Sequence, residues 1–524
     1  MLNFRIEIGL ILIMLGLGLS SQAQHYNYPL DRYSRFFLLQ NDTIHHGSFQ
    51  GQMQSRYHVD TLKGFEPKVR YTKASQKLYD QHLIELRTKD LNASMDLLLH
   101  FEVGRESWED NEYQDTTRMS RNMRGFIIRA DIGNKVSISS SFREFQSYVP
   151  WYLLQYSQAT DVMPGSGRVK PFNATGLDHN IAQGYVSYRP WEFLNLQFGT
   201  QRNSIGSGHR SLLLSDQGYA YPQLKASLYL MEGRLRYHVV HAWLQTLDRL
   251  PNGITPESLF IRKGGGFKYL EYAASDALSI GLFEGVVWNR FIPGEGNEGG
   301  NPLMYSPLIG TAIASLGLAD LQDNVVIGLD VSARVQPGLL LYGQYMLDAE
   351  DRDGFQFGLQ TIDLGVDGLG VRLEYNSVAP FSYTNGSVRQ GYNHFSEALA
   401  HPMGAGFDEV RASALYFKKR WFADVSYVHA TQLLDGLDSL GVLSTPGGNI
   451  FSTSDFAVRE DLERYTATLD QVDVRVGRMF NPKSNFNAYL GYLYRDRRGA
   501  GERQGQSMLT FGIEMSLFNR NEDF

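Results

Sequence analysis

One stretch of the sequence, residues 201–221, is dense in side chains that donate hydrogen bonds. It carries Arg202, Asn203, His209 and Arg210, and it then turns apolar. Guanidinium, amide and imidazole groups bind sugar hydroxyls and carboxylates. The stretch therefore has two interpretations. Its donors face such a ligand, or it is an inward-folded loop whose arginines pair with carboxylates of the surrounding protein.

A second set of candidates is aromatic. Four rings fall in or beside long polar connections, and we interpret them as surface contacts for glycans: Trp108, Trp151, Tyr152 and Tyr392. An aromatic face with hydrogen-bonding neighbours suits a sugar ring. The alternative is an ordinary solvated loop surface.

No catalytic motif accompanies these residues. The sequence lacks a His-Glu-x-x-His pair, a Walker loop and a Gly-x-Ser-x-Gly elbow, and its 13 histidines are scattered. With no cysteine there is no thiolate metal site or nucleophile. We therefore expect no enzyme, no metal and no cofactor. Gly264-Gly265-Gly266 lies inside a strand pattern, where a bulge or a close approach is expected rather than phosphate binding.

In the segments that hold these residues, apolar and polar side chains alternate with a period of two. In the last of them Leu509, Phe511 and Ile513 oppose Thr510 and Gly512. About 18 such strands are predicted, over residues 92–104, 121–131, 134–146, 180–189, 192–200, 222–231, 233–244, 261–274, 277–290, 322–335, 338–348, 355–364, 368–377, 410–418, 421–431, 470–479, 485–495 and 506–518. Charged residues of both signs recur on the polar faces of these strands. Neither lipid nor the dry core of a β-sandwich accepts such charges, so the polar faces must line an aqueous or polar lumen.

The connections between these strands alternate between short turns and long loops. Outer-membrane barrels place tight turns on the periplasmic rim and long loops outside, and a soluble β-sandwich has no reason to keep this order. We therefore predict an all-β fold, a transmembrane outer-membrane β-barrel of antiparallel strands with exterior long loops. Aromatic residues near strand ends are expected at the membrane interfaces: Trp191, Trp243, Trp288, Tyr342, Tyr345, Trp421, Tyr427, Tyr489, Tyr492 and Tyr494.

The residues before the first strand have another character. Residues 1–23 resemble an export signal, with an apolar run too short to span a membrane as a helix. Residues 24–90 are expected to form a periplasmic or lumen-closing segment, with helices near 31–39 and 74–87. Residues 91–524 would form the barrel. The net charge of −7 favours no polyanionic partner, so nucleic-acid binding is not expected.

Several short motifs occur in the order found in one known family. They are Gly199-x-Gln201-Arg202, Ile205-Gly206-x-Gly208, Arg210-Ser211-Leu212-x-Leu214-Ser215, Asn301-Pro302-Leu303, Asp323-Asn324-Val325-Val326-Ile327-Gly328-Leu329-Asp330 and Leu341-Tyr342-Gly343-Gln344 through Asp348. With these motifs the chain resembles the Wzi-type capsule-assembly outer-membrane family. Near the start, Tyr28-Pro29-Leu30-Asp31-Arg32 and His46-Gly47-Ser48 resemble its RemB-like gliding-motility branch.

The resemblance implies an 18-stranded barrel with N-terminal periplasmic helices that acts as a lectin for capsular polysaccharide. It identifies no sugar-binding residue, because the exterior loops do not match. The expected partners are outer-membrane lipid and exported polysaccharide. Two alternatives stay open at this point: an accessory barrel bound to gliding-motility or secretion proteins, and a diffusion porin.

Overall fold

The computed structural model describes residues 25–27, 49–50, 53–55, 72–108, 118–249, 260–292, 296–297, 302–318, 323–385, 390–437, 443–451, 465–499, 502–515 and 522–524. The expected export signal and the helix near 31–39 lie outside these residues. None of the described helices is long and apolar enough to cross a membrane.

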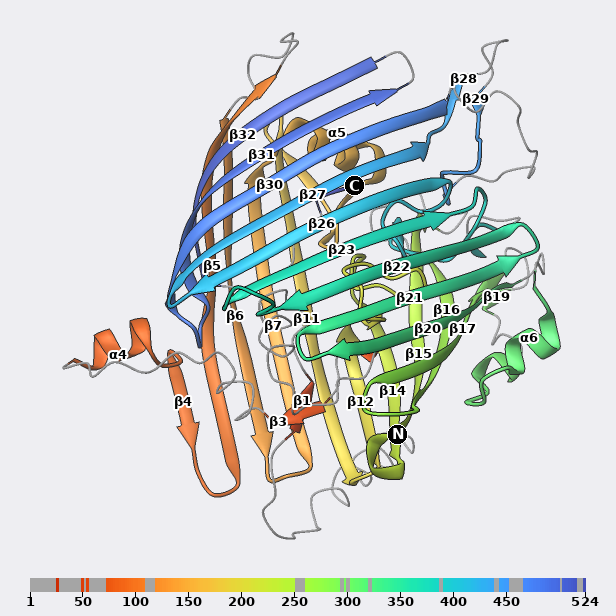
Figure 1. Ribbon diagram of the computed structural model, residues 1–524, viewed down its shortest axis with the longest axis horizontal. Coiled ribbons are helices and arrows are strands. Elements are labelled where there is room, and N and C mark those ends of the chain that lie inside the picture. Colours follow the sequence, from red (N-terminus) through yellow and green to blue (C-terminus); the bar gives the residue numbers. More distant parts are fainter. Residues whose placement is uncertain are drawn as a thin grey trace.

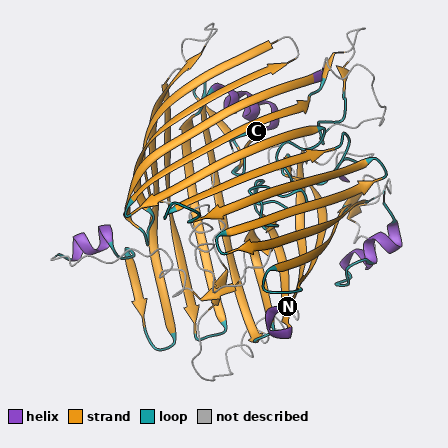
Figure 2. Ribbon diagram, viewed as in Figure 1, coloured by secondary structure: helices purple, strands orange, loops and turns teal. Residues whose placement is uncertain are grey.

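Eighteen antiparallel strands close into a barrel, which confirms the predicted fold (Figures 1 and 2). They are β5 (Leu91–Trp108), β6 (Arg118–Ile132), β7 (Val136–Tyr148), β11 (Gly176–Trp191), β12 (Leu194–Gln201), β14 (Tyr221–Leu230), β15 (Leu235–Arg249), β16 (Phe260–Ala273), β17 (Leu278–Asn289), β20 (Asn324–Gln336), β21 (Leu339–Ala349), β22 (Arg352–Ile362), β23 (Leu369–Val378), β26 (Phe407–Lys418), β27 (Trp421–Leu433), β30 (Thr466–Asn481), β31 (Phe486–Gly499) and β32 (Glu502–Met515). The last strand, β32, pairs with the first, β5, so neither keeps a free edge over that stretch.

Each strand turns one apolar row outward. In β32 the side chains of Leu509, Phe511 and Ile513 are exposed, as the alternation predicts. Most of the aromatic residues expected at the membrane interfaces are exposed too. Three of them are buried. Tyr342 and Tyr489 point into the lumen, because they fall on the inward row of their strands. Trp288 is on an outward row but is buried against Met304 and Ala312.

The two rims differ in the length of their connections. At one rim neighbouring strands are joined by tight turns, such as residues 133–135 and 419–420. At the other they are joined by long loops, such as residues 149–175 and 379–406, and this confirms the predicted alternation. The long-loop rim also holds α5 (Trp151–Thr160), β8 (Val162–Met163), β9 (Gly167–Arg168), β10 (Lys170–Phe172), β13 (Ser204–Ile205), β18 (Phe291–Ile292), β19 (Gly296–Asn297), β24 (Asn393–His394), β25 (Glu397–Ala398), β28 (Gly436–Leu437) and β29 (Leu443–Ser444).

The predicted helix over 74–87 is only half right. The helix α4 (Lys73–Tyr79) ends early, and β4 (Ile84–Arg87) follows as a strand. The pairing of β32 with β5 stops at His100, and β4 takes over the remaining edge of β5. The unpaired backbone groups of that edge need a partner, which outweighs the helical pattern. Three further short strands lie in the N-terminal segment: β1 (His25–Asn27), β2 (Phe49–Gln50) and β3 (Met53–Ser55).

One part of the outer wall carries an ion pair instead of apolar side chains. Lys268 of β16 and Glu284 of β17 are cross-strand partners on the outward rows, and their charged atoms lie 2.5 Å apart. A segment of the loop after β17, residues 302–318, folds down over them. It contains η3 (Pro302–Tyr305) and α6 (Thr311–Leu316), and Figure 1 shows α6 outside the barrel. We call residues 302–318 the outer strap.

The outer strap satisfies both charges. The ammonium of Lys268 donates to the Thr311 hydroxyl at 3.1 Å, and the Ile313 N–H donates to the Glu284 carboxylate at 3.3 Å. The side chains of Leu303 and Leu308 stay exposed on the strap. The strap therefore replaces two charges by an apolar surface, which hydrocarbon accepts at far lower cost.

The Gly264–Gly266 run makes room for this covering. A Cβ at Gly264 would lie 2.1 Å from the Trp288 ring, and one at Gly266 would lie 3.2 Å from the Met304 carbonyl oxygen. The register of β15 with β16 continues through all three glycines. A close approach is therefore confirmed and a bulge is not present.

Lys268→Met should destabilise the barrel by about 3–5 kcal/mol, because Glu284 would keep its charge under the outer strap without a counter-ion. The free energy of unfolding in urea, measured in detergent micelles, tests this. Arg234→Met is the control, since Arg234 and its partner Asp276 are 57% and 79% exposed, and such pairs contribute about 0–1 kcal/mol. Equal stability of the two variants would contradict a buried pair.

Candidate functional site

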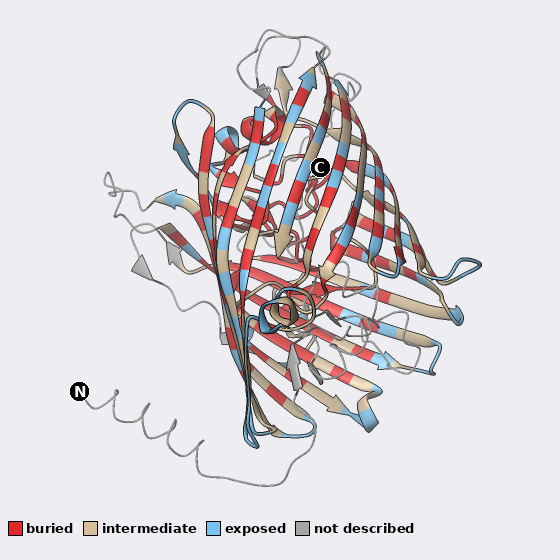
Figure 3. Cartoon of the chain, turned by 90° about the vertical axis from the view of Figure 1, so that its left-hand side faces the viewer, coloured by how far each residue is buried: buried red, intermediate tan, exposed pale blue. Residues whose placement is uncertain are grey.

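Three loops of the long-loop rim fold into the barrel and meet in the lumen. They are residues 149–175, 202–220 and 379–406, and we call them the α5 loop, the inward loop and the β24–β25 loop. Figure 3 shows buried segments inside the ring of strands. The apolar side chains of the inward loop and the β24–β25 loop form one cluster with the inner wall, which includes Leu212, Leu213 and Leu214, each 0% exposed. Those of the α5 loop, such as Leu153 and Leu154, form a second cluster with the wall. Together the three loops form a plug.

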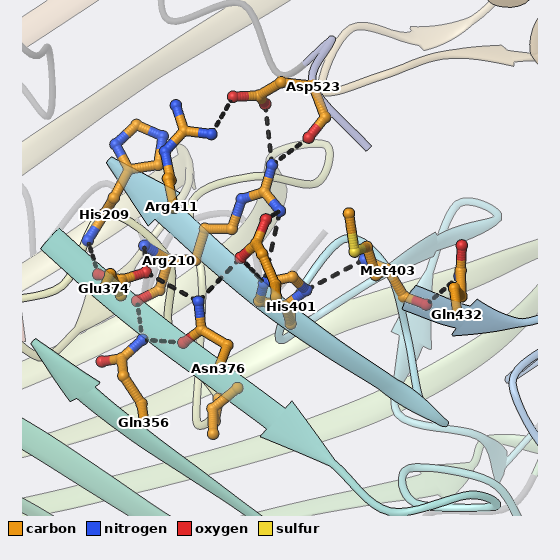
Figure 4. A network of polar contacts seen from close by, with 12 residues as sticks. His209, Arg210, Gln356, Glu374, Asn376, His401, Met403, Arg411, Gln432 and Asp523 are labelled. Atoms are coloured by element: carbon orange, nitrogen blue, oxygen red, sulfur yellow. Dashed lines mark hydrogen bonds and ion pairs between the residues drawn. The ribbon is translucent and has the colours of Figure 1, made fainter. Parts of the chain in front are cut away.

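The inward loop is anchored by Arg210, whose side chain is completely buried (Figure 4). Its guanidinium donates to the Glu409 carboxylate of β26 and, at 3.0 Å, to the Asp523 carboxylate. Burial by itself would lower the pKa of Arg210, but Glu409 and Asp523 raise it above its ordinary value. Arg210 therefore carries a permanent positive charge at the centre of the lumen.

The wall strands hold the main chain around Arg210. The N–H groups of His209 and Arg210 donate to the Glu374 carboxylate of β23 at 2.7 and 3.4 Å. The Gln356 amide of β22 donates to the Arg210 carbonyl oxygen at 2.9 Å. Asn376 donates to both Glu374 and Glu409, at 3.0 and 2.8 Å. These contacts fix the loop by backbone and side chain together.

His401 completes this network from the β24–β25 loop. Its Nδ1 accepts a hydrogen bond from the Met403 N–H at 3.2 Å, so the proton lies on Nε2, which donates to Glu409 at 2.9 Å. Burial holds the pKa of His401 below its ordinary value, although the Glu409 carboxylate opposes this. His401 is therefore neutral at pH 7 and acts as a donor.

Arg202 lies where the three loops meet. Its guanidinium donates to the carbonyl oxygens of Gly165 in the α5 loop and Asp216 in the inward loop. The Gly165 N–H donates to the Glu397 carboxylate of the β24–β25 loop at 2.5 Å. Asn203 donates to the Tyr221 hydroxyl at 3.0 Å. The four predicted donors are thus brought together in one loop, and Arg202, Asn203 and Arg210 bind protein groups.

The short motifs of β20 and β21 lie on the inner wall behind this loop. In β20, Asn324 donates to the Tyr383 carbonyl oxygen at 3.0 Å, and Gly328 leaves room for Leu213, which a Cβ would meet at 2.2 Å. In β21, the Gln344 amide oxygen accepts from the Leu212 N–H at 2.9 Å. These motif residues therefore contact the plug by hydrogen bonds and by a close approach.

The predicted aromatic contacts separate into two pairs. Trp108 and Trp151 lie at the long-loop rim with ring centroids 5.8 Å apart, and both are partly exposed. Tyr152 and Tyr392 were expected on the surface but are buried in the plug, at 6% and 0% exposure. Their hydroxyls donate to main-chain oxygens of Glu522 and Leu213, at 2.9 and 2.8 Å. Burial therefore removes these two from the exterior face.

Sequence reasoning missed the segment Glu522–Phe524, which also lies in the lumen (Figure 4). It missed the wall arginines that this segment contacts as well, Arg411 of β26 and Arg495 of β31. Their alternation marked them as inward, but nothing in a strand pattern indicates which distant segment pairs with them. Among the described residues no three His, Asp or Glu side chains are placed to share a metal ion.

Docking of the plug should weaken as the pH rises. Burial raises the pKa of Glu397 to about 8 from 4.5, against the Gly165 N–H and the Arg202 charge, which lower it. A raised carboxyl pKa favours the docked state below pH 4.5 and costs stability progressively as the pH rises through 8. Hydrogen exchange of the α5 loop, corrected for intrinsic rates, should show more opening at pH 8 than at pH 5.

Glu397→Gln should abolish that pH dependence, because a neutral amide does not titrate. Asp276→Asn at the short-turn rim is the matched control and should keep it. The same slope in Glu397→Gln as in the unchanged protein would assign the effect to another group.

The comparisons with known proteins give a fold and no family. No protein-family model matches the chain, and no curated protein sequence is significantly similar to it. Among solved structures it is similar to Wzi of Escherichia coli, an outer-membrane protein involved in group 1 capsule assembly and a carbohydrate-binding β-barrel, with TM-score 0.53, 11% identity, and coverage of 95% of this chain and 100% of that one. OprD of Pseudomonas aeruginosa aligns with TM-score 0.40, 12% identity, 82% of this chain and 96% of that one. The chain thus has the fold of outer-membrane barrels.

Proposed function

We propose that this chain is a non-catalytic outer-membrane barrel that binds or organises exported polysaccharide at the cell surface. The observation that carries the proposal is the plugged lumen within a barrel similar in fold to Wzi along nearly its whole length. A carbohydrate-binding barrel needs a rigid rim that presents loops, and it needs no open bore.

The plug favours binding over diffusion. The inward loop is held at its backbone by Glu374, Gln356 and Gln344, and its three leucines are fully buried. A diffusion porin keeps a polar, water-filled channel of the kind that such packing closes. The porin alternative is therefore the weaker of the proposals.

The proposed orientation puts the long-loop rim outside the cell and the N-terminal segment in the periplasm. Outer-membrane barrels have this arrangement of long and short connections. In that orientation Trp108 and Trp151 face the exterior. Glu106 accepts from the Trp151 N–H at 3.3 Å, which fixes the start of α5 against β5. The two rings are tilted by 59° to each other and offer adjacent aromatic faces to a sugar.

Trp108→Ala with Trp151→Ala should weaken binding of the cognate polysaccharide by about tenfold or more, since each lost aromatic contact costs on the order of 1 kcal/mol. A glycan array read with the purified barrel identifies the ligand, and titration of the variant measures the loss. Trp191→Ala is the control, because Trp191 stacks on Phe193 at the opposite rim. A heat-modifiable gel shift verifies that all variants remain folded.

Unchanged capsule retention in a deletion strain, together with no glycan binding, would contradict the proposal. Co-purification with motility or secretion components would then favour the accessory role that the RemB-like motifs suggest. Large single-channel conductance in planar bilayers would favour the porin instead.

A further inference from the structure

The segment Glu522–Phe524 is held in the lumen by arginines from three wall strands. The Glu522 carboxylate accepts from Arg121 of β6 at 2.7 Å. The Asp523 carboxylate accepts from Arg411 of β26 and from Arg210 of the inward loop. Figure 4 shows Asp523 between these two guanidinium groups. Two neighbouring carboxylates thus bridge the wall and the plug.

A fourth arginine and two aromatic rings surround the same segment. Arg495 of β31 donates to the main-chain oxygen of Phe524 at 3.0 Å, and its guanidinium lies 4.5 Å from the Tyr152 ring centre. The Phe524 ring meets Tyr156 edge-on at 4.8 Å. Nε and Nη1 of Arg495 are buried without a hydrogen-bond partner in the described part of the chain. The site therefore has donors that the segment does not use.

Two of the four arginines also have a carboxylate of the wall as a partner. Arg210 keeps Glu409, and Arg121 keeps Glu102 at 3.8 Å. Among the described residues, the carboxylate in an ion pair with Arg411 is that of Asp523, and Arg495 donates to the Phe524 oxygen. Buried guanidinium groups without an anion are costly. An acidic group between Arg411 and Arg495 therefore stabilises this part of the wall.

The site also continues into a cavity. The cavity is lined by Arg121, Glu522 and the wall residues His100, His179 and Glu514, and it reaches the α5 loop at Ser166. The His179 ring stacks on Phe145 at 4.5 Å, which leaves its edge to the cavity. Space and polar groups thus extend beyond the stretch that Glu522 fills.

We propose that this lumenal arginine site binds an acidic oligosaccharide with carboxylates on neighbouring sugars, and that Glu522 and Asp523 are its exchangeable internal occupants. This rests on the proposed function, because the ligand is the exported polysaccharide or its end. Guanidinium forks match carboxylates, and the Tyr156 ring that Phe524 contacts edge-on suits a sugar ring. The ligand class is thus an acidic glycan, and its site lies in the lumen and not at the Trp108–Trp151 rim.

The absence of cysteine gives a clean test in the full-length protein. Phe524→Cys places a single thiol in the site, and Asp276→Cys places one at the exposed short-turn rim as the matched control. Labelling by a maleimide in detergent should be at least about tenfold slower at position 524 than at 276, since docking must open first. Trigalacturonate should accelerate labelling at 524 about tenfold and leave 276 unchanged, and neutral maltotriose should affect neither.

Two further variants separate binding from folding. Arg411→Met with Arg495→Met should make position 524 react rapidly at once and remove the response to trigalacturonate. In the cysteine-free protein, Glu522→Gln with Asp523→Asn should raise the affinity for trigalacturonate about tenfold, because the internal competitor is lost. The heat-modifiable shift verifies each barrel.

Labelling at 524 that is as fast as at 276, or that ignores trigalacturonate while the arginines are intact, would overturn the lumenal site. If glycan binding at the Trp108–Trp151 rim persists in that case, the proposed function stands and only this inference fails. If rim binding fails while trigalacturonate still accelerates labelling at position 524, the lumenal site stands and the proposed function of the rim fails.

Discussion

Every charged group that a barrel strand turns inward must find its partner inside the barrel. Hydrocarbon surrounds the wall, so no solvent beyond the wall competes for these groups. In this protein the inward rows of β22, β23 and β26 present Gln356, Glu374 and Glu409. The inward loop provides their partners, which are a carbonyl oxygen, backbone N–H groups and the Arg210 guanidinium. The plug and the wall therefore depend on each other, because each provides the hydrogen-bond partners of the other's polar groups.

The outer strap solves the same problem on the opposite side of the sheet. Lys268 and Glu284 face outward, where the membrane offers no counter-ion, and the strap supplies hydroxyl, N–H and an apolar cover. Two charged residues on otherwise apolar outward rows thus predict that another segment of the chain covers them. The glycines beside it belong to the same arrangement, since Gly264 admits Trp288.

The architecture was predictable from the sequence because alternation and turn spacing are local properties. All 18 strands and the two unlike rims follow from them. At Gly264–Gly266 the sequence left a bulge or a close approach open, and the continuous register selects the close approach. Contacts between distant segments were not predictable. Arg210 was singled out by its type, yet its partners Glu409 and Asp523 lie 199 and 313 residues away. The strand β4 was not predicted for the same reason. Its residues have helical spacing, which is a local property, but they pair with the open edge of β5, which the local sequence does not reveal.

The motifs that suggested a family mark places where a loop enters a wall. Asn324, Gly328 and Gln344 each contact the plug, and none of them faces the exterior. Such residues specify that the lumen is filled and leave open what the protein binds. For the proposed polysaccharide binding, the described structure offers the rim, where two aromatic rings are accessible, and the arginine site, where an acidic segment of the chain occupies a position that a ligand of like charge would fit. The two places are coupled through α5, because Trp151 belongs to the rim pair and the next residue, Tyr152, lies against Arg495 at the arginine site. A change in the α5 loop therefore affects both.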